Sequence, residues 1–340
     1  MIDGKIGVCV VGAGRAGMIH ARNFCKNVPG AKLVAVADPF EETAKAAAKE
    51  LALDRYYLSH EQALNDSRID AYVVVSPTKY HASIVRAIAA EKKHILCEKP
   101  MAMTEAECDE MIRAAEENHI CLQIGFMRRF DSSFRHAKEA VDQGAIGDVV
   151  MIRSNTRGPS VPRPWMYDIK KSNGPLAEVN SHDIDTMRWF TGSEFRTLYA
   201  IGGNYRCPDA REKYPDFYDN VVMCASFENG MQGMMDGAQG VGYAYDSKVE
   251  ILGTKGCIYL GNLKGDNVVI MDSGSKTGTC NLVNSWRNLF EDAYRNEDIA
   301  FIRAIENGSE PEVTGHDGKM AVRVVNAGNL SITEKRVVEL

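Results

Sequence analysis

A glycine-rich turn near the start of the chain has the composition of a phosphate-binding loop. Residues 12–17 read Gly-Ala-Gly-Arg-Ala-Gly and follow directly on the apolar run 6–11. In a dinucleotide site of this pattern the first glycine makes a tight strand-to-helix turn, the second lets the backbone approach a pyrophosphate, and the third permits close packing of helix on sheet. The N-terminus of the following helix then faces the anion. The predicted cofactor-binding residues of this loop are Gly12, Ala13, Gly14, Arg15 and Ala16.

An acid stands where a dinucleotide site of this kind binds ribose. Asp38 ends the apolar run 33–37 and lies 21 residues after Gly17. A carboxylate there accepts hydrogen bonds from both ribose hydroxyls and repels a 2′-phosphate, and neither Pro39 nor Phe40 adds a positive charge. The sequence therefore favours NAD over NADP as the cofactor. The competing interpretation of Asp38 is a solvated acid at a strand end.

A lysine follows another short apolar run. Residues 94–97 read His-Ile-Leu-Cys and precede Glu98, Lys99 and Pro100. If 94–97 is a strand of a parallel sheet, Lys99 stands at the carboxyl edge, where open α/β sheets bind their ligands. The proline fixes the backbone that follows, so the loop turns sharply and could hold the lysine amine over a nicotinamide ring. A lysine that merely lies on the surface is the alternative.

Three ionisable residues recur at helical spacing in the middle of the chain. Glu178, His182 and Asp185 stand at i, i+4 and i+7, which places them on one face of a helix predicted over 176–190. His182 could act as a general base near neutral pH, with a neighbouring carboxylate to orient its ring. A solvated polar face explains the same pattern. A metal site made of the three is disfavoured because no further ligand cluster supports it, and no metal is predicted.

Two segments of the second half combine aromatic residues, prolines and charges. Segment 154–173 carries Arg157, Arg163 and Trp165 among several prolines. Trp165 could stack on the face of a sugar ring while the arginines bind its hydroxyls, which would suit a sugar or glycoside; a proline-rich arm against a neighbouring subunit is the alternative. Segment 203–219 is predicted to be a long excursion over the surface, either a lid or an ordinary loop.

The apolar pattern predicts an α/β fold with two domains. Up to residue 125, short β-rich runs alternate with helical segments, which indicates a Rossmann-type, doubly wound parallel sheet. Beyond it, strands follow one another between glycine-rich turns, which indicates an α+β domain with a large, mainly antiparallel sheet. The predicted domains are 1–125, for NAD binding, and 126–340, for substrate binding and oligomerisation. The predicted strands are 5–11, 32–37, 71–75, 94–97, 120–124, 149–155, 197–203, 220–227, 231–238, 247–252, 256–260 and 267–271, and the predicted helices are 17–27, 40–51, 80–91, 104–118, 176–190, 287–306 and 317–333.

Composition excludes several classes of protein. The 340 residues are 45% apolar, enough for a large core. The 46 acidic and 40 basic residues are interspersed, with no basic stripe for nucleic acid. No apolar run approaches the roughly 18 to 20 residues of a membrane span, and no signal peptide precedes the first predicted strand, so a cytoplasmic location is expected. The nine cysteines include no C-x-x-C pair, which predicts mostly buried, reduced thiols.

Together these motifs resemble the glucose–fructose oxidoreductase and inositol dehydrogenase family over nearly the whole chain. The glycine loop and the Glu98-Lys99-Pro100 triplet are its most specific markers. Further similarity lies in Ser76-Pro77-Thr78 with His81, in segment 123–131 and in the helix around His182. Segments 125–129, 242–246 and 286–294 resemble the myo-inositol 2-dehydrogenase branch most closely.

The resemblance implies a dehydrogenase that oxidises a ring CH–OH group of a polyol to a ketone. Lys99 would position and polarise the hydroxyl, His182 would remove its proton with Glu178 as a helper, and hydride would pass to the nicotinamide ring of NAD. Inositol dehydrogenases usually carry aspartate where this chain has Glu178, and the extra methylene moves the carboxylate by roughly 1 Å or more, which can change the hydroxyl that is presented. The implied cofactor contacts are Ser76, Pro77, Thr78, His81, Glu98 and Lys99. The implied substrate pocket is Lys99, Arg128, Asn155, His182, Asp185, Tyr245 and Tyr294, to which the reasoning above adds Trp165.

Three other functions stay open. One is a sugar or glycoside dehydrogenase of the same family. Another is a non-catalytic NAD-binding sensor, which the presence of both Lys99 and His182 disfavours. The third is hydride transfer between two substrates on a retained cofactor, for which no enclosing arm precedes the glycine loop. The expected partners are a small polyol or sugar and, by the resemblance, further copies of the chain in a dimer or tetramer, with no nucleic acid and no membrane.

Overall fold

The computed structural model describes residues 4–261, 264–272, 274 and 277–340. The chain forms two compact units, and each is built from two stretches of sequence. The first unit runs to Asp131 and includes Asp292–Val322; the second comprises Ser132–Glu291 and Arg323–Leu340. The predicted domains, 1–125 and 126–340, differ from this division mainly because they assign 292–322 to the second domain. That stretch joins the first unit because Phe301 and Ile302 pack into its core.

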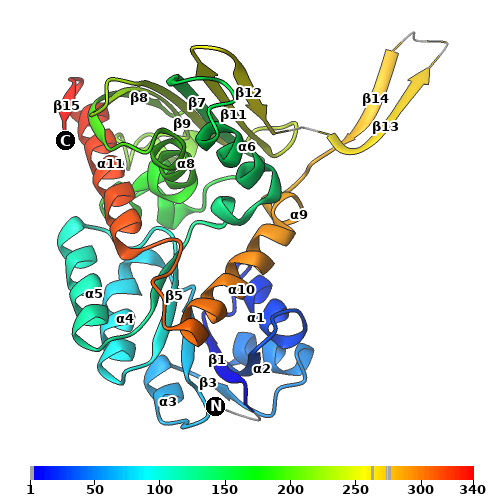
Figure 1. Ribbon diagram of the computed structural model, residues 1–340, viewed down its shortest axis with the longest axis vertical. Coiled ribbons are helices and arrows are strands. Elements are labelled where there is room, and N and C mark those ends of the chain that lie inside the picture. Colours follow the sequence, from blue (N-terminus) through cyan, green and yellow to red (C-terminus); the bar gives the residue numbers. More distant parts are fainter. Residues whose placement is uncertain (1–3, 262–263, 273, 275–276) are drawn as a thin grey trace. The chain divides into compact units, whose positions relative to one another are not determined.

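Six parallel strands form the sheet of the first unit (Figure 1). The order β3-β2-β1-β4-β5-β6 changes direction between β1 and β4, as in a doubly wound sheet. Strands β1 and β4 are buried along their whole length, which explains their uninterrupted apolar sequences. The predicted strands are confirmed, and only the two-residue β3 is additional. The strands are β1 (Ile6–Val11), β2 (Ala31–Ala37), β3 (Tyr56–Tyr57), β4 (Ala71–Val74), β5 (His94–Glu98) and β6 (Leu122–Gly125).

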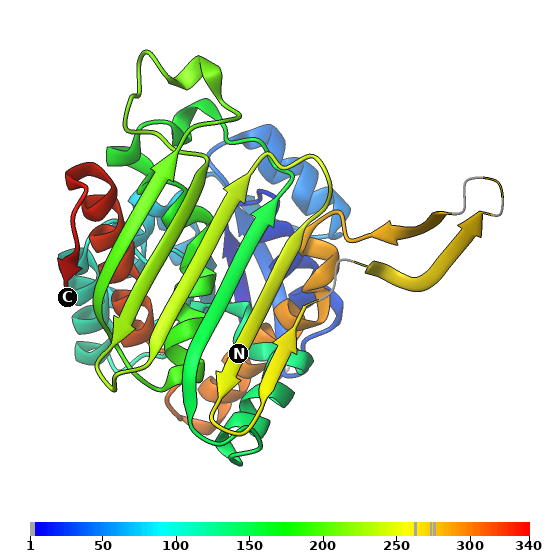
Figure 2. The ribbon, with the colours of Figure 1, turned by 90° about the horizontal axis from the view of Figure 1, so that it is seen from above.

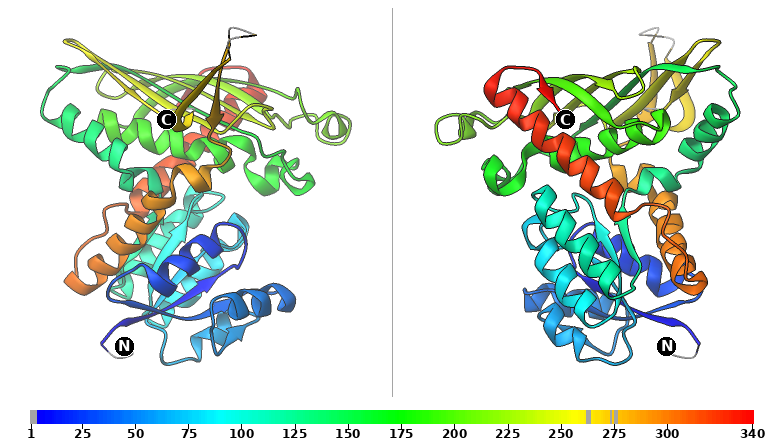
Figure 3. Two further views of the ribbon diagram at one scale, coloured as in Figure 1. Left: turned by 90° about the vertical axis from the view of Figure 1, so that its right-hand side faces the viewer. Right: turned by 60° about the vertical axis from the view of Figure 1, so that its left-hand side comes forward.

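Helices cover both faces of this sheet. Helices α1, α2 and α10 share one core cluster with the strands, to which they contribute Phe24, Ala47 and Phe301. Helices α4 and α5 pack together on the opposite face, as the reversal of strand order requires (Figure 3). The helices of this unit are α1 (Gly17–Lys26), α2 (Glu41–Glu50), α3 (His60–Leu64), α4 (His81–Ala90), α5 (Glu105–Glu117) and most of α10 (Glu291–Asn307), with 3₁₀ turns at Thr78–Tyr80 and Met127–Phe130.

Seven strands form the sheet of the second unit, in the order β12-β11-β7-β10-β9-β8-β15. Neighbouring strands are antiparallel except for β7 and β10, which run parallel. The mainly antiparallel sheet is thus confirmed. Figure 2 views the face of this sheet that α8 does not cover. The strands are β7 (Val149–Gly158), β8 (Phe195–Gly203), β9 (Asn220–Phe227), β10 (Gln232–Gln239), β11 (Asp246–Gly253), β12 (Cys257–Leu260) and β15 (Val338–Glu339).

The remaining elements of the second unit are helices and one hairpin. Helix α8 packs against β7. Strands β13 and β14 form a two-stranded sheet of their own (Figure 1). Helices α6 and α7 and strands β14 and β15 were not predicted. The bounds are α6 (Ser132–Asp142), α7 (Ile169–Ser172), α8 (Ser181–Thr191), α9 (Trp286–Leu289), α11 (Gly315–Glu334, which begins in the first unit), β13 (Lys264–Asp272) and β14 (Thr277–Leu282).

The segments 154–173 and 203–219 pack on each other. Tyr167 from the first forms a small buried cluster with residues of the second, including Phe217, whose ring centroid lies 4.8 Å away. The Tyr167 hydroxyl donates a hydrogen bond to Asp209 at 3.0 Å. Segment 203–219 is therefore held in place by the small cluster that it forms with Tyr167. Trp165, in contrast, is 50% exposed.

The surface carries apolar residues on the sheet of the second unit. Tyr199, Ile201 and Val222 are exposed on the face away from α8. Formation of a homo-oligomer stays a prediction. Within the described residues, no helix combines the length and the apolar character that crossing a membrane requires. None of the nine cysteines forms a disulfide; four are buried, fewer than predicted.

Candidate active site

The glycine loop joins β1 to α1, and its glycines meet different requirements. A Cβ on Gly12, where φ is +100°, would lie 2.7 Å from the Val75 carbonyl oxygen. A Cβ on Gly17 would lie 1.8 Å from the carbonyl oxygen of Gly12, so α1 packs directly on the loop. A Cβ on Gly14 would have no described atom within 4 Å and would stand in open space. This arrangement fits a pyrophosphate, which approaches such a loop at the second glycine.

We expect alanine to affect protein stability at Gly12 and NAD binding at Gly14. Gly12→Ala should destabilise the fold, because its φ alone costs about 1 to 3 kcal/mol for a residue with a side chain and the new methyl also overlaps Val75. Gly14→Ala should leave the unfolding free energy within about 0.5 kcal/mol of wild type and weaken NAD binding about tenfold or more, since a methyl there blocks the pyrophosphate. Denaturant unfolding without cofactor and NAD titration by fluorescence separate the two. Unchanged NAD affinity in Gly14→Ala would contradict the assignment of the loop.

Asp38 lies beside the glycine loop at the carboxyl end of β2. Its Oδ2 accepts a hydrogen bond from the Ala13 amide at 2.9 Å, and its Oδ1 accepts one from the Phe40 amide at 3.0 Å. The residue is 7% exposed, so it is not the solvated acid of the competing interpretation. The carboxylate is thus fixed at the edge of the glycine loop, and its contact with the ribose of NAD stays a prediction.

His81 connects the loops that follow β4 and β5. Its Nε2 lies 2.6 Å from the Ser76 carbonyl oxygen and its Nδ1 lies 3.0 Å from the Pro100 carbonyl oxygen. Burial lowers the pKa of His81, which favours the neutral ring. Both ring nitrogens thus contact the main chain, and His81 holds the two loops together. Pro77 and Thr78 lie on the same sheet edge and are at least partly exposed.

Lys99 follows β5 at the carboxyl edge of the sheet that also carries the glycine loop. Its residue is partly exposed, and its peptide bond to Pro100 is cis. Glu98 before it is buried and points into the unit rather than along this edge. One carboxylate oxygen of Glu98 accepts a hydrogen bond from the Lys99 amide at 2.9 Å, and the other lies 3.2 Å from His20 Nε2.

Two further residues of the predicted pocket are almost fully buried in the first unit. Arg128 is 1% exposed and lies in the 3₁₀ turn after β6; Tyr294, in α10, is 3% exposed. The Tyr294 ring meets the His20 ring edge-on, with centroids 5.4 Å apart. Substrate contacts by Arg128 and Tyr294 stay predictions.

In the second unit, His182 and Asp185 lie on α8, which follows a π-helical turn at Leu176–Asn180. Three positions apart in one α-helix, they share a face, and both are buried, which argues against a solvated polar stripe. Glu178 lies in the π-helical turn, so the predicted single α-helical stripe holds only for the other two. Such turns are frequent at functional sites.

Asp183, which the sequence did not single out, anchors α8 on the sheet. The hydroxyls of Ser154 and Thr156 donate hydrogen bonds to its Oδ1 at 2.6 and 3.0 Å, and Asn180 donates one to its Oδ2 at 2.8 Å. Asn180 in turn fills the space at Gly237, where a Cβ would lie 2.0 Å from its Oδ1. These contacts set the rotation of α8, and with it the direction of His182.

Strand alternation separates Asn155 from α8. Ser154 and Thr156 point toward the helix, so Asn155 between them points to the opposite face of the sheet. Substrate contact by Asn155 stays a prediction. Tyr245 is buried at the start of β11, and its ring contacts Phe290 with centroids 6.5 Å apart.

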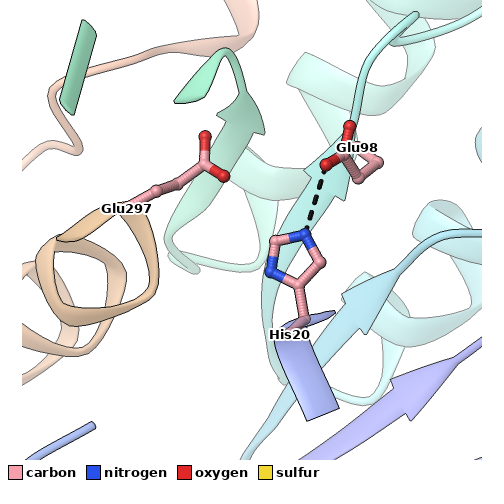
Figure 4. Close-up of side chains that lie close together, drawn as sticks. All are labelled: His20, Glu98 and Glu297. Carbon is pink, nitrogen blue, oxygen red and sulfur yellow. Dashed lines mark hydrogen bonds and ion pairs between the residues drawn. The ribbon is translucent and has the colours of Figure 1, made fainter. Parts of the chain in front are cut away.

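Within the described part of the chain, one group has the residue types and spacing to hold a metal ion. It consists of His20, Glu98 and Glu297, which converge from α1, β5 and α10 with their ligand atoms within 4.8 Å of one another (Figure 4). Glu178, His182 and Asp185 do not form such a group. Because Asp298 and Glu98 engage both ring nitrogens of His20, we assign no metal to this cluster.

These features of the first unit define a Rossmann domain with a site built for a dinucleotide. The chain belongs to the oxidoreductase family with an NAD-binding Rossmann fold, whose model matches residues 6–126, and residues 134–259 match the GFO/IDH/MocA C-terminal domain. The family resemblance of the sequence motifs is thereby confirmed, as is NAD as the cofactor.

Known proteins resemble the chain over its full length. A myo-inositol 2-dehydrogenase of Thermotoga maritima is 34% identical over 97% of both chains. An NAD(+)-dependent scyllo-inositol 2-dehydrogenase of Bacillus subtilis is 31% identical over 100% of this chain and 97% of its own. The crystal structure of scyllo-inositol dehydrogenase from Lactobacillus casei with NAD(H) and scyllo-inositol has a TM-score of 0.90 at 27% identity, and covers 98% of this chain and 99% of its own.

Sequence reasoning missed the buried polar residues behind Lys99. His20 and Asn23 lie on the face of α1 that also buries Ala21 and Phe24. The helical spacing of these polar residues places them on the apolar face of α1, and this pattern is the signal by which the sequence could have indicated their burial. Their partner Asp298 could not be found in this way, because it is 275 or more positions away in the sequence.

Proposed function

We propose that this NAD-dependent oxidoreductase oxidises a ring CH–OH group of an inositol-like cyclic polyol to a ketone. The observation that carries the proposal is the position of Lys99, at the carboxyl edge of the sheet whose glycine loop fits NAD. The full-length similarity to myo-inositol and scyllo-inositol dehydrogenases supports the substrate class.

In this proposal Lys99 and His182 divide the work on the hydroxyl. The Lys99 ammonium donates a hydrogen bond to the hydroxyl oxygen and stabilises the negative charge that develops there. His182 accepts the hydroxyl proton as general base, and the carboxylates of Asp185 and Glu178 favour its charged form. The bound nicotinamide accepts the hydride that leaves the same carbon. One C–H and one O–H bond are broken, and the carbon–oxygen bond becomes a carbonyl.

The rival substrate class is a sugar or glycoside. It rests on Trp165, whose residue is 50% exposed on a 3₁₀ turn, Pro164–Met166, and which could therefore stack on a pyranose. The full-length similarity to inositol dehydrogenases favours the polyol.

A substrate panel tests the proposed function. NADH absorbance should rise with myo-inositol or scyllo-inositol and NAD, and should rise much less with NADP, because Asp38 repels a 2′-phosphate. The panel should also contain glucose, galactose and several glucosides. Turnover of a sugar or glycoside alone would transfer the assignment to the rival class. Binding of NAD without turnover of any of these would contradict the proposal and favour the non-catalytic sensor.

A further inference from the structure

A continuous chain of hydrogen-bonding groups lies behind Lys99 inside the first unit. It begins at the Lys99 amide, which donates to Glu98 Oε2 at 2.9 Å. The other oxygen of Glu98 lies 3.2 Å from Nε2 of His20, and Nδ1 of His20 lies 2.6 Å from Asp298 Oδ1. Asn23 then donates to the second oxygen of Asp298 at 2.8 Å. The chain connects β5, α1 and α10.

The two contacts of His20 suit a doubly protonated ring. A carboxylate oxygen lies within hydrogen-bonding distance of each ring nitrogen, and a carboxylate only accepts. An imidazolium ring, with a proton on each nitrogen, would satisfy both groups when the two carboxyls are ionised. The other groups that face it are on α10: the Glu297 carboxylate, in the same cluster, and the Tyr294 ring. Figure 4 shows the Glu98 and Glu297 side chains approaching His20 from different elements.

The electrostatics of the cluster agree with this geometry. Burial of the ring opposes its charge, but the adjacent carboxylates of Asp298 and Glu98 outweigh burial and hold the pKa of His20 well above its usual value. Burial raises the pKa of Asp298, while the charge of His20 and the hydrogen bonds from His20 and Asn23 act in the opposite direction. His20 is fully buried, which weakens the screening of this charge by water.

The cluster leaves Glu98 little freedom. Next to it on β6, a Cβ on Gly125 would lie 3.0 Å from both Cα and Cδ of Glu98, so the glycine allows strand and side chain to meet closely. Glu98 is thus confined by β6 on one side and by His20 on the other. Its remaining oxygen fixes the Lys99 amide, at the point where the chain leaves the sheet.

We propose that His20 is a positioning residue for Lys99: its charged ring, clamped by Asp298, fixes the Glu98 carboxylate and so the main chain from which the Lys99 side chain extends. This inference rests on the proposed function of Lys99. It predicts that loss of the proton on His20 misplaces Lys99 without disturbing the glycine loop.

The first test compares His20, on α1, with the half-buried His94 at the start of β5. His20→Gln removes the charge and should lower kcat with inositol roughly 10- to 100-fold, the cost of a misplaced catalytic group, while the dissociation constant for NAD changes little. His94→Gln is the matched control, because His94 begins β5 and its ring accepts a hydrogen bond from the Cys121 amide at Nδ1, away from Glu98. Its kcat should equal that of wild type. An unchanged kcat in folded His20→Gln overturns the proposal.

The second test uses pH to separate positioning from a structural role. Asp298→Asn keeps the shape of the side chain but removes the charge that holds the proton on His20. The ring should then lose its proton at lower pH, so the kcat of the variant relative to wild type should fall as the pH rises from about 6 to about 9. A relative kcat that is lowered but constant over this range would indicate a structural role alone and overturn the proposal.

The third test does not depend on a substrate. Nitrogen NMR of protein with labelled histidine, assigned by loss of the signal in His20→Gln, should show both ring nitrogens of His20 protonated at about pH 8. A neutral ring at this pH overturns the proposal, whether the second nitrogen is simply unprotonated or binds a metal ion. If wild type turns over no polyol or sugar, the proposed function fails, whereas this measurement still decides the state of His20.

Discussion

Replacing Lys99 with alanine is expected to lower kcat about 10²-fold or more, the range for a lost acid–base or electrostatic group. The ammonium stabilises charge that exists on the hydroxyl oxygen only as the proton leaves, so its loss should affect kcat more than substrate binding. The dissociation constant for NAD should change little, because Asp38 and the glycine loop remain intact. Stopped-flow or steady-state measurement of NADH formation gives kcat, and fluorescence titration gives NAD affinity.

Lys93→Ala is the control for this variant. Lys93 immediately precedes β5 and is partly exposed, like Lys99, but its ammonium donates a hydrogen bond to the Ile69 carbonyl oxygen at the opposite end of the sheet. The control should retain the wild-type kcat. Nearly wild-type turnover by Lys99→Ala would remove Lys99 from the reaction, and a large loss of NAD affinity would assign it to cofactor binding alone.

Replacing His182 with alanine should also lower kcat about 10²-fold or more, since no other group is proposed to accept the hydroxyl proton. Added imidazole should restore part of the activity, because it can occupy the space of the lost ring and accept the proton, whereas a purely structural loss would not respond. His136→Ala, on the exposed side of α6 in the same unit, is the control and should behave as wild type.

The response of His182→Ala to imidazole distinguishes a base from a positioning group. Asp183 holds α8 on the sheet independently of His182, so the variant should keep its fold. Its free energy of unfolding, measured with denaturant, should lie within about 1 kcal/mol of the wild-type value. A folded variant that is inactive and gains nothing from imidazole would contradict the role of His182 as general base.

The first unit was largely predictable because its information is local. The central strands are buried on both faces and so read as continuous apolar runs, and the glycine loop stands between such a run and a helical segment. The position of Lys99 then followed from topology, since every parallel strand ends at the same edge. What local pattern did not reveal is that 292–322 returns to this unit, because the contact of Phe301 with the core is purely tertiary.

The surroundings of His182 in the second unit were less predictable, because they depend on contacts that leave little local signal in the sequence. The π-helical turn that carries Glu178 has no distinctive sequence signal, and the helical spacing of Glu178, His182 and Asp185 suggested one continuous α-helix. Asn155 was assigned from resemblance, and the hydrogen bonds of Ser154 and Thr156 to Asp183, which turn Asn155 away from α8, have no signal in the sequence. The His20 cluster joins residues from three distant segments and needs the fold to assemble it.

The most direct test of the central claim follows the hydride itself. Inositol that carries deuterium on its ring carbons should be incubated with NAD and the enzyme, and both products examined by mass spectrometry. The account predicts one deuterium on the nicotinamide of the reduced cofactor and a ring ketone that has lost one deuterium. Two results would contradict the account: reduced cofactor that carries no deuterium, and NAD that binds to the wild-type protein but stays oxidised.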